Sequence, residues 1–476
     1  MNDKYISPLS KRYAGEDMQR LFSDDKKFRT WRSLWIALAE SQMELGLPIR
    51  EEQIQQMKEN KDNINYSVAE AKEKEIRHDV MSHIHAFGKQ CPDAKGIMHL
   101  GATSCFVGDN TDLIVMKEGL VLIRKKLINT IKLLSEFAME YKDLPTLGFT
   151  HFQPAQPTTV GKRATLWIHD LLLDLEALEF VISNLKLRGA KGTTGTQASF
   201  LELFDGDGEK TKELDKKIAE KLGFSGTYPV TGQTYSRKVD FQVLQVLSGI
   251  AQSAYKFSND IRLLAHMKEI EEPFEKSQVG SSAMAYKRNP MRSERMASIA
   301  RFIIVDSINP ALNTTGQWLE RTLDDSANRR LCIPEAFLAT DGLLSLYINV
   351  ADGLVVYPMV IQAHLEEELP FMATETILME GVKRGGDRQV LHEAIRRHSL
   401  ATANSIKVDG KKNDLVQKLG SDPEFNMTEY EIWEMIKPER FIGRSIEQVE
   451  EFVQGEVKDI LERYSEDIGI EVNILV

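Results

Sequence analysis

Five long stretches of this chain repeat apolar residues at helical spacing, and their length limits the folds that the chain can adopt. In the first, residues 109–141, apolar side chains recur every three to four positions from Leu113 to Ala138 without an internal proline. The other four stretches are residues 158–187, 236–267, 290–312 and 325–350. At about 1.5 Å per residue a 30-residue helix is roughly 45 Å long, more than a compact domain needs. The pattern therefore predicts an all-α fold built on an elongated bundle of five long helices.

Shorter helical patterns flank this bundle on both sides. Near the N-terminus, Phe28, Trp31 and Leu38 share helical spacing after Ser23, which predicts a helix that begins with a serine N-cap and ends by Gly46. A chain of 476 residues is also too long for one ordinary core. We therefore predict three helical domains, with the bundle in the second: residues 1–103, 104–356 and 357–476.

The apolar stripes on the long helices are wider than the core of a single bundle requires. Either the flanking domains cover the remaining apolar side chains, or other copies of the chain do. Because a bundle with apolar outer faces favours self-association, we expect a homo-oligomer.

The charge and the cysteine content argue against several classes of protein. A net charge of −11 opposes nonspecific binding to nucleic acid, whose main driving force is the neutralisation of phosphates. The three cysteines include no CxxC pair and are odd in number, which is typical of a reducing compartment. The first residues lack the apolar segment of a signal peptide, and no long uncharged apolar run indicates a membrane span. We expect a soluble, cytoplasmic protein that binds neither nucleic acid nor a membrane.

Several common catalytic motifs are missing from the sequence. It contains no GxxxxGKS/T, no GxGxxG after a predicted strand, no GxSxG and no HExxH. These absences argue against a P-loop nucleotidase, a Rossmann dehydrogenase, an α/β-hydrolase and a zinc protease of the HExxH type.

The run from Gly280 to Arg295 combines small residues with a cluster of cations. Two serines lie among the small residues at its start, and four basic side chains follow within nine positions: Lys287, Arg288, Arg292 and Arg295. Such a run can be an ordinary solvated loop. Alternatively, a mobile loop that brings hydroxyl groups next to cations suits chemistry on a substrate with several negative charges.

Three histidines follow Arg77 within a short distance, at positions 78, 83 and 85. Their spacing is not the His-x-x-x-His that places two imidazoles on one helix face, and no cysteine or acidic ligand set accompanies them. Metal binding is therefore disfavoured. We interpret Arg77-His78-Asp79 as a polar helix start that faces a cleft.

Two further segments carry hydroxyl, amide or guanidinium groups near predicted helix starts. Between His99 and Asn110, Thr103 and Ser104 are typical both of an anion-binding site and of a plain capping turn, and the residues leave both open. Before the third long helix, Gln233 supplies an amide that can orient a substrate.

Residues 320–330 bring two arginines and a serine to the start of the last long helix. Arg321, Ser326 and Arg330 can face a common cleft, where the arginines would bind a carboxylate or a phosphate with two hydrogen bonds each. The alternative is a solvated, charged helix start.

His151 lies just before two prolines that lead into the second long helix. Pro154 and Pro157 stiffen this segment, so His151 is expected to be held in place. A fixed imidazole with a pKa near neutrality is a suitable general acid or base, although a single loop histidine often has no such role.

In their order along the chain, these segments resemble one family. Gly280–Pro290 is similar to the signature of the fumarase/aspartase superfamily, Gly-Ser-Ser-x-Met followed by Lys-x-Asn-Pro, and residues 281–294 more narrowly resemble the adenylosuccinate lyase family. Matching segments run from Lys11-Arg12-Tyr13 to the C-terminal third: His99–Asn110, Phe149–Gln156, Gly192–Gln197, Thr231–Tyr235 and Glu320–Arg330. Where that family usually has proline after the methionine, this chain has Ala285, which would loosen the loop.

The resemblance implies a β-elimination that releases fumarate from adenylosuccinate, giving AMP, and from the succinyl-carboxamide ribotide of purine biosynthesis. It implies Ser281 as the general base and His151 as the general acid, with no metal or organic cofactor. It assigns the succinyl carboxylates to Lys287 and Asn289, with Thr103, Ser104 and Gln233 alongside. It assigns the nucleotide to Arg12, Tyr13, Arg295, Arg321, Ser326 and Arg330. His78, with Arg77 and Asp79, is assigned either to substrate orientation or to the support of His151. Arg288 and Arg292 are left as ordinary helix-start charges.

The resemblance also implies a homotetramer in which each active site is built from three subunits. Two alternatives remain for the function. The first is another fumarate-releasing lyase, such as one acting on argininosuccinate. Such an enzyme has less use for four arginines that suit a substrate with a phosphate, namely Arg12, Arg295, Arg321 and Arg330. A non-catalytic helical scaffold would tolerate the loss of Ser281, His151 or Lys287, and all three are present.

Overall fold

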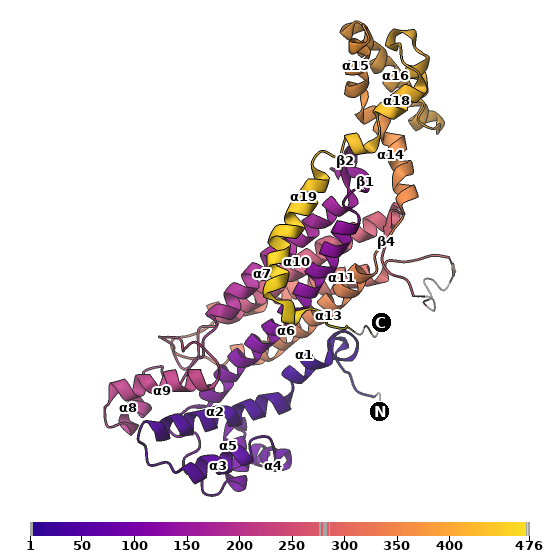
Figure 1. Cartoon of the computed structure of the whole chain (residues 1–476). Helices are drawn as coiled ribbons and strands as arrows, with labels where there is room; N and C mark the ends of the chain where they lie inside the picture. Colours follow the sequence, from indigo (N-terminus) through magenta and orange to yellow (C-terminus); the bar gives the residue numbers. More distant parts are fainter. Residues whose placement is uncertain (1–2, 276–277, 279–282, 285, 473, 475–476) are drawn as a thin grey trace.

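Long helices dominate the computed structural model, which describes residues 3–275, 278, 283–284, 286–472 and 474. The predicted long segments form α6 (Ser104–Glu140), α7 (Val160–Asn184), α10 (Lys238–His266), α11 (Met291–Asp306) and α13 (Asp325–Asp352). These helices lie side by side in an elongated bundle, with α10 packed on α11 and with α6 packed on α7 and α13 (Figure 1). Their buried faces, which include Leu120, Leu171 and Leu344, share one core. The predicted all-α fold is confirmed, with two short antiparallel strand pairs added.

One predicted helix is wrong, because residues 290–312 do not form a single element. Helix α11 ends at Asp306, and α12 (Ile308–Thr315) follows after Ser307. Pro310 explains the break: it lacks the N–H that would bond to the carbonyl oxygen of Asp306, and its ring collides with that carbonyl. The side-chain amide of Asn309 donates to the same oxygen instead, at 3.3 Å.

A β-hairpin that was not predicted precedes α7. Strand β1 (Pro145–Thr150) pairs antiparallel with β2 (Gln153–Thr159), so that the second long helix begins at Val160 rather than at residue 158. A smaller pair joins β3 (Ile270–Glu271) to β4 (Val355–Val356), directly after the end of α13.

The remaining helices before α10 lie mostly around the N-terminal end of α6, at the lower end of the molecule in Figure 1, whereas η1 and α1 lie against the middle of α13 and α6. They are η1 (Leu9–Tyr13), α1 (Glu16–Leu21), α2 (Asp24–Glu44), α3 (Glu51–Glu59), α4 (Tyr66–Ile76), α5 (Asp79–Gln90), α8 (Ala198–Leu203) and α9 (Gly208–Lys221). The predicted N-cap of α2 is confirmed, since the Ser23 hydroxyl accepts a hydrogen bond from the backbone N–H of Lys26 at 3.2 Å. Trp35 and Phe87 connect these helices to the core of the bundle.

The chain after α13 contributes to two separate cores. Its elements are α14 (Pro358–Met372), α15 (Thr374–Lys383), α16 (Arg388–Asp409), α17 (Leu415–Ser421), η2 (Pro423–Phe425), α18 (Glu429–Met435), η3 (Pro438–Arg440), α19 (Ser445–Phe452), η4 (Val453–Val457), α20 (Lys458–Arg463) and η5 (Ser465–Asp467). Residues between Ala373 and Ile436 form a core of their own, at the upper end of Figure 1. The chain then returns along the bundle, where Val449 and Val457 join the main core. The predicted domain boundaries stay a prediction.

Part of the bundle surface remains apolar in the single chain. Leu166, Leu173 and Phe180 are exposed on α7 at intervals of seven residues. A second exposed strip runs along α11 and α12 and consists of Phe302, Val305, Ile308 and Leu312. The flanking helices do not cover these side chains.

Helix α13 lies in the core of the bundle. Among the described residues it alone is long and apolar enough to cross a membrane, and 83% of the relevant window is buried inside the protein. Burial of this kind is typical of the central helix of a soluble bundle.

The histidines near position 80 have separate roles. His83 is buried, and its ring stacks on Phe28 with 3.7 Å between the ring centroids. Burial lowers the pKa of His83 to about 4, so that this imidazole is neutral in the folded protein at pH 7. Within the described part of the chain, no three His, Cys, Asp or Glu side chains are grouped so that they could hold a metal ion. His83 is therefore a core residue.

Replacement of His83 by phenylalanine is expected to make the protein less sensitive to acid. The unfolded chain binds a proton on this imidazole below about pH 6.5, whereas the folded chain does so only near pH 4, so stability falls as the pH drops through this window. The loss amounts to about 2 kcal/mol between pH 7 and pH 5. Urea unfolding midpoints at both pH values measure it, with the exposed-site variant His392→Gln as control. An equal fall in wild type and His83→Phe would contradict the assignment.

Candidate active site

Polar segments that are far apart in the sequence meet where α6 and α13 begin, next to the start of α5. The Oγ atom of Ser104 lies 3.3 Å from Nε2 of His78. The guanidinium of Arg330 lies 3.8 Å from the carboxylate of Asp79. Arg77 is the left-handed residue that ends α4 and turns the chain into this corner, with φ of 55°. The structure thus brings the predicted residues of α5, α6 and α13 together within one chain.

His78 is held in a defined orientation because it caps α5. Its Nδ1 accepts a hydrogen bond from the backbone N–H of Met81 at 3.3 Å. The neutral imidazole therefore carries its proton on Nε2, the atom that faces Ser104. His78 presents a hydrogen-bond donor to the space in front of α6.

Gln233 and Arg321 lie in the same cluster as Ser104, and contacts with neighbouring residues hold both of them. The backbone N–H of Gln233 donates to the carbonyl of Glu320 at 3.0 Å, and the thiol of Cys105 donates to Oε1 of Gln233 at 3.5 Å. The guanidinium of Arg321 bonds to the buried carboxylate of Asp325 at 2.8 Å. Ser326, one residue further along α13, is half-buried.

The chain segments that carry these residues approach one another more closely than side chains would allow. A Cβ atom on Gly195 would lie 1.8 Å from the carbonyl oxygen of Thr231, and one on Gly232 would lie 2.6 Å from that of Glu320. Glycine is thus required at both positions, which explains why the segments 192–197, 231–235 and 320–330 belong together.

The hydroxyl of Thr103 is available for a ligand. This residue occupies the N-cap position of the 37-residue α6, yet its side chain caps no backbone N–H. Its Oγ1 is buried and has no hydrogen-bond partner among the described residues. Because no side chain caps the N-terminus of α6, an anion bound here would be stabilised by its first N–H groups. Of the two alternatives for this segment, the geometry favours the anion site.

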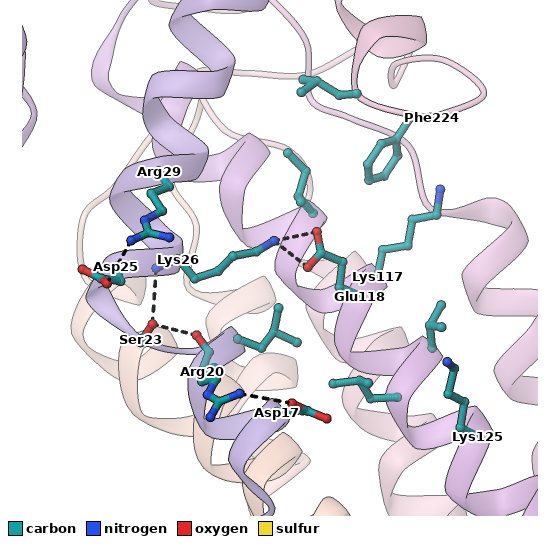
Figure 2. Close-up of a pocket in the computed structure, with 15 residues that line it drawn as sticks. Asp17, Arg20, Ser23, Asp25, Lys26, Arg29, Lys117, Glu118, Lys125 and Phe224 are labelled. Carbon is teal, nitrogen blue, oxygen red and sulfur yellow. Dashed lines mark hydrogen bonds and ion pairs between the residues drawn. The ribbon is translucent and has the colours of Figure 1, made fainter. Parts of the chain in front are cut away.

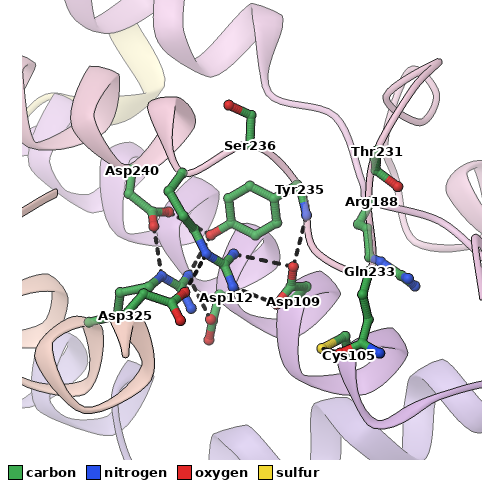
Figure 3. Close-up of polar contacts among 12 residues, drawn as sticks. Cys105, Asp109, Asp112, Arg188, Thr231, Gln233, Tyr235, Ser236, Asp240 and Asp325 are labelled. Atoms are coloured by element: carbon green, nitrogen blue, oxygen red, sulfur yellow. Dashed lines mark hydrogen bonds and ion pairs between the residues drawn. The ribbon is translucent and has the colours of Figure 1, made fainter. Parts of the chain in front are cut away.

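A buried network that the sequence did not predict lies beneath these residues (Figure 3). Arg237 connects Asp109 on α6 to Asp325 on α13, and Asp109 also accepts the backbone N–H of Tyr235 at 3.0 Å. Sequence reasoning missed these residues because the partners are separated by 88 and 128 positions. The available signal was the presence of charged residues at positions of the long helices that face the core.

His151 lies at the tip of the β1–β2 hairpin, in a two-residue turn between Thr150 and Gln153. His151 and Phe152 both adopt left-handed conformations, with φ of 54° and 56°. A turn of this kind normally contains glycine or asparagine, so the two bulky residues are strained. The paired strands fix the backbone on both sides of His151, whose imidazole is exposed.

Within one chain, His151 is far from the residues at the start of α6. The hairpin follows the C-terminal end of α6, close to α14 and α19, whereas His78 and Ser104 lie at the opposite end of that helix (Figure 1). Helix α6 has 37 residues, which corresponds to about 55 Å at 1.5 Å per residue. A single chain cannot bring the two groups together.

The predicted base, Ser281, and Ala285 lie outside the described residues. Of the other residues predicted in this segment, Lys287 is exposed, whereas Asn289 and Arg295 are half-buried. The segment leaves the bundle at β3, which pairs with β4 after the C-terminal end of α13. It therefore starts at the end of α13 opposite Arg321 and Arg330.

Arg292 is not an ordinary helix-start charge. It is buried, and its guanidinium bonds to Asn349 at 2.7 Å and to Glu275 at 2.6 Å. Arg288 pairs at 3.5 Å with Glu271 on β3. These two cations fix the C-terminal part of the segment to the bundle.

Arg12 and Tyr13 lie apart from both the start of α6 and the hairpin that carries His151. They belong to η1, which packs on the middle of α13, where a Cβ atom on Gly342 would lie 2.8 Å from Cβ of Tyr13. The backbone N–H of Gly15 donates to Asp341 at 2.6 Å and anchors this turn. The structure does not bring Arg12 or Tyr13 next to Ser104 or Arg330 within one chain.

A large surface groove is separate from all of these residues. It has a volume of about 870 Å³ and is lined by α1, α2, α6 and Phe224 (Figure 2). Its charges are mostly paired with each other, as for Lys26 and Glu118 at 2.6 Å. None of the predicted site residues lines it. The candidate active site is therefore assigned to the clustered helix N-termini and not to this groove.

Comparison with known proteins identifies the family. A family model described as "Lyase" matches residues 33–304, and a second, described as "Adenylosuccinate lyase C-terminus", matches residues 370–452. The adenylosuccinate lyase of Saccharomyces cerevisiae is 51% identical over 478 residues, which is 99% of both chains. That of Schistosoma mansoni is 48% identical over 476 residues, which is 100% of this chain and 99% of the relative.

A solved structure supports the fold. The 3-carboxy-cis,cis-muconate lactonizing enzyme from Pseudomonas putida superposes with a TM-score of 0.80 at 21% identity, covering 95% of this chain and 99% of the other. With the fold, the clustered polar residues and the full-length similarity combined, the chain belongs to the adenylosuccinate lyase family.

Proposed function

We propose that this protein cleaves adenylosuccinate to AMP and fumarate in the cytoplasm, and that it releases fumarate from the succinyl-carboxamide ribotide of purine biosynthesis at the same site. The observation that carries the proposal is the cluster of His78, Ser104, Gln233, Arg321 and Arg330 at converging helix N-termini. Full-length similarity to adenylosuccinate lyases supports it.

In the proposed mechanism, Ser281 and His151 move protons on opposite sides of the substrate. Ser281 takes the proton from the carbon next to a carboxylate, and the C–H electron pair forms the double bond of fumarate. The C–N bond breaks, and the departing nitrogen takes its proton from His151. A free serine hydroxyl is hardly acidic, so this role requires a dry pocket in which the cation of Lys287 favours the alkoxide.

The remaining residues bind the substrate. Lys287 and Asn289, together with Thr103, Ser104 and Gln233, hold the succinyl carboxylates, where negative charge builds up as the proton leaves. The nucleotide is bound by Arg12, Tyr13, Arg295, Arg321, Ser326 and Arg330. The donor on Nε2 of His78, with Arg77 and Asp79, orients the substrate.

We further propose that each site is assembled from three subunits of a homotetramer. About 55 Å of α6 separates His151 from Ser104 within one chain, so a site that contains both residues needs more than one subunit. The exposed apolar strips on α7 and on α11–α12 supply the surface for such an assembly.

The test of the activity is an ultraviolet assay that follows the loss of adenylosuccinate and identifies AMP and fumarate as products. Cleavage of argininosuccinate without cleavage of adenylosuccinate would instead identify another fumarate-releasing lyase. Absence of turnover on both substrates, in a folded protein, would favour the scaffold alternative.

Thr103→Val is expected to raise the KM for adenylosuccinate about tenfold, because a hydrogen bond to a charged group is lost. The melting temperature should not fall, since the hydroxyl has no partner to lose among the described residues. Thr130→Val is the matched control: its buried hydroxyl donates to the carbonyl of Lys126 at 2.9 Å. That variant should lose about 1 kcal/mol of stability and keep its KM. The opposite pattern in the two variants would contradict the role of Thr103.

A further inference from the structure

Two linked groups of buried charges lie where α6, α10 and α13 begin (Figure 3). The first group is made of Asp109, Arg237 and Asp325, and the second of Asp112, Asp240, Arg329 and the hydroxyl of Tyr235. They are similar in composition, although Asp112 is 41% exposed whereas the other charged side chains are at most 8% exposed. Only the first group touches residues predicted to bind substrate.

In the first group, Arg237 is the central residue. Its side chain is 1% exposed, its Nε donates to Asp325 at 2.7 Å, and its two terminal nitrogens each donate to Asp109 at 3.2 Å. The other oxygen of Asp325 accepts from Arg321 at 2.8 Å. Asp109 also accepts the backbone N–H of Tyr235, two residues after Gln233. The group therefore ends on Arg321 at one side and on the Gln233 segment at the other.

In the second group, Arg329 takes the central place. It donates to Asp240 at 2.7 Å and to the hydroxyl of Tyr235 at 2.6 Å, and it pairs with Asp112 at 2.9 Å. The Tyr235 hydroxyl donates to Asp240 at 2.5 Å. None of these contacts reaches Arg321, Gln233 or another residue assigned to the substrate.

Stability alone is a poor reason for such a group. Taking several charges out of water is costly, and replacing a buried ion pair by apolar residues of the same volume is often neutral or stabilising. Buried charges are instead well suited to fixing one arrangement of the chain, because each hydrogen bond has a defined direction.

We propose that Asp325 and Arg237 are positioning residues for Arg321, and that Asp109 positions the segment of Gln233. The inference rests on the proposed function. A guanidinium has five N–H donors, and Asp325 engages one nitrogen of Arg321, whose side chain is still 20% exposed. Arg321 is thereby held in one orientation before the substrate arrives, and its other donors remain for the substrate, so that less conformational entropy is lost on binding.

The charge state of Asp325 is consistent with this role. Burial alone would raise its pKa, but the charge and hydrogen bond of Arg237, followed by the charge of Arg321, lower it below the ordinary value. Asp325 thus stays ionised at neutral pH and holds both arginines.

The test is a double-mutant cycle between Asp325 and Arg321 in the full-length protein, with adenylosuccinate turnover and calorimetric binding of AMP as readouts. Asp325→Asn is expected to raise the KM and the dissociation constant of AMP at least tenfold while kcat changes less than threefold. In an Arg321→Met background, the same substitution should have no further effect, because its target is gone. A purely structural role would add its effect in both backgrounds.

The control is Asp240→Asn in the second group. Asp240 is as buried as Asp325, with 0% of either side chain exposed, and it also holds an arginine. We expect a comparable fall in melting temperature and a KM within twofold of wild type. If Asp325→Asn does not fold, Arg237→Lys, which keeps the charge and loses the fork on Asp109, enters the same cycle.

The outcomes separate this inference from the function on which it rests. A wild-type protein that cleaves adenylosuccinate, together with an Asp325→Asn variant whose KM stays within twofold, would overturn the positioning role alone. Additive effects of Asp325→Asn and Arg321→Met would overturn it as well. A wild-type protein that neither cleaves nor binds adenylosuccinate would overturn both the proposed function and the inference.

Discussion

Replacement of His151 by alanine is expected to lower kcat by at least ~10³ while KM changes little. In the proposed reaction the imidazole gives its proton to the departing nitrogen only as the C–N bond breaks, so its loss affects the transition state rather than substrate binding. Steady-state kinetics with adenylosuccinate measure the effect. The limb of the pH–rate profile that reports an essential acid should also disappear in the variant.

The backbone at this position supplies a control for misfolding. His151 has a φ of 54°, which glycine adopts without strain. His151→Gly should therefore be at least as stable as wild type and as inactive as His151→Ala, which is the trade-off expected when strain is retained at a functional residue. His392→Ala, an exposed imidazole on α16, should leave kcat unchanged. A loss of less than tenfold in kcat for His151→Ala would exclude His151 as the proton donor.

The helices could be predicted from the sequence because their signal is local. Apolar residues at intervals of three and four positions locate α6, α10 and α13 to within a few residues at most ends. The break between α11 and α12 was also readable, since Pro310 falls inside the predicted helix and removes the bond to Asp306. That prediction failed because the apolar period was given more weight than the proline.

The hairpin that carries His151 could not be predicted in the same way. Strand β2 contains Pro154 and Pro157, which are disfavoured in a sheet interior and tolerated only because this strand pairs on one side. The turn consists of His151 and Phe152, neither of which is typical of a two-residue hairpin. Only the pairing with β1 defines the structure, and strand pairing is not encoded in the period of either segment.

The site itself was identified from the resemblance, whereas the groups that hold it required the structure. Ser104, Gln233 and Arg321 were named from segments that match the adenylosuccinate lyase family. The contacts of Arg237 with Asp109 and Asp325 join positions that are 128 and 88 residues apart, and no local pattern marks such partners. Charged residues within the apolar stripe of a helix indicate only that partners must exist.

The second large effect concerns the proposed origin of the acid and the base in different subunits. His151→Ala and Ser281→Ala should each retain no more than about 10⁻³ of the wild-type activity, because each lacks one proton-transfer group. When the two inactive proteins are mixed in equal amounts, dissociated and reassembled, the mixed tetramers should recover about a quarter of wild-type activity. The gain over either parent is therefore more than a hundredfold.

The figure of a quarter follows from random assembly. If a site takes His151 from one subunit and Ser281 from another, each of these two subunits is intact at that position with a chance of about one half, so about a quarter of the sites are complete. If both groups came from the same subunit, no site would ever be complete, since every chain carries one of the two lesions.

A mixture of His151→Ala with His151→Gly is the matched control and must stay inactive. Subunit exchange is verified with two affinity tags on the two variants. Exchange without any recovered activity would contradict the origin of His151 and Ser281 in different subunits.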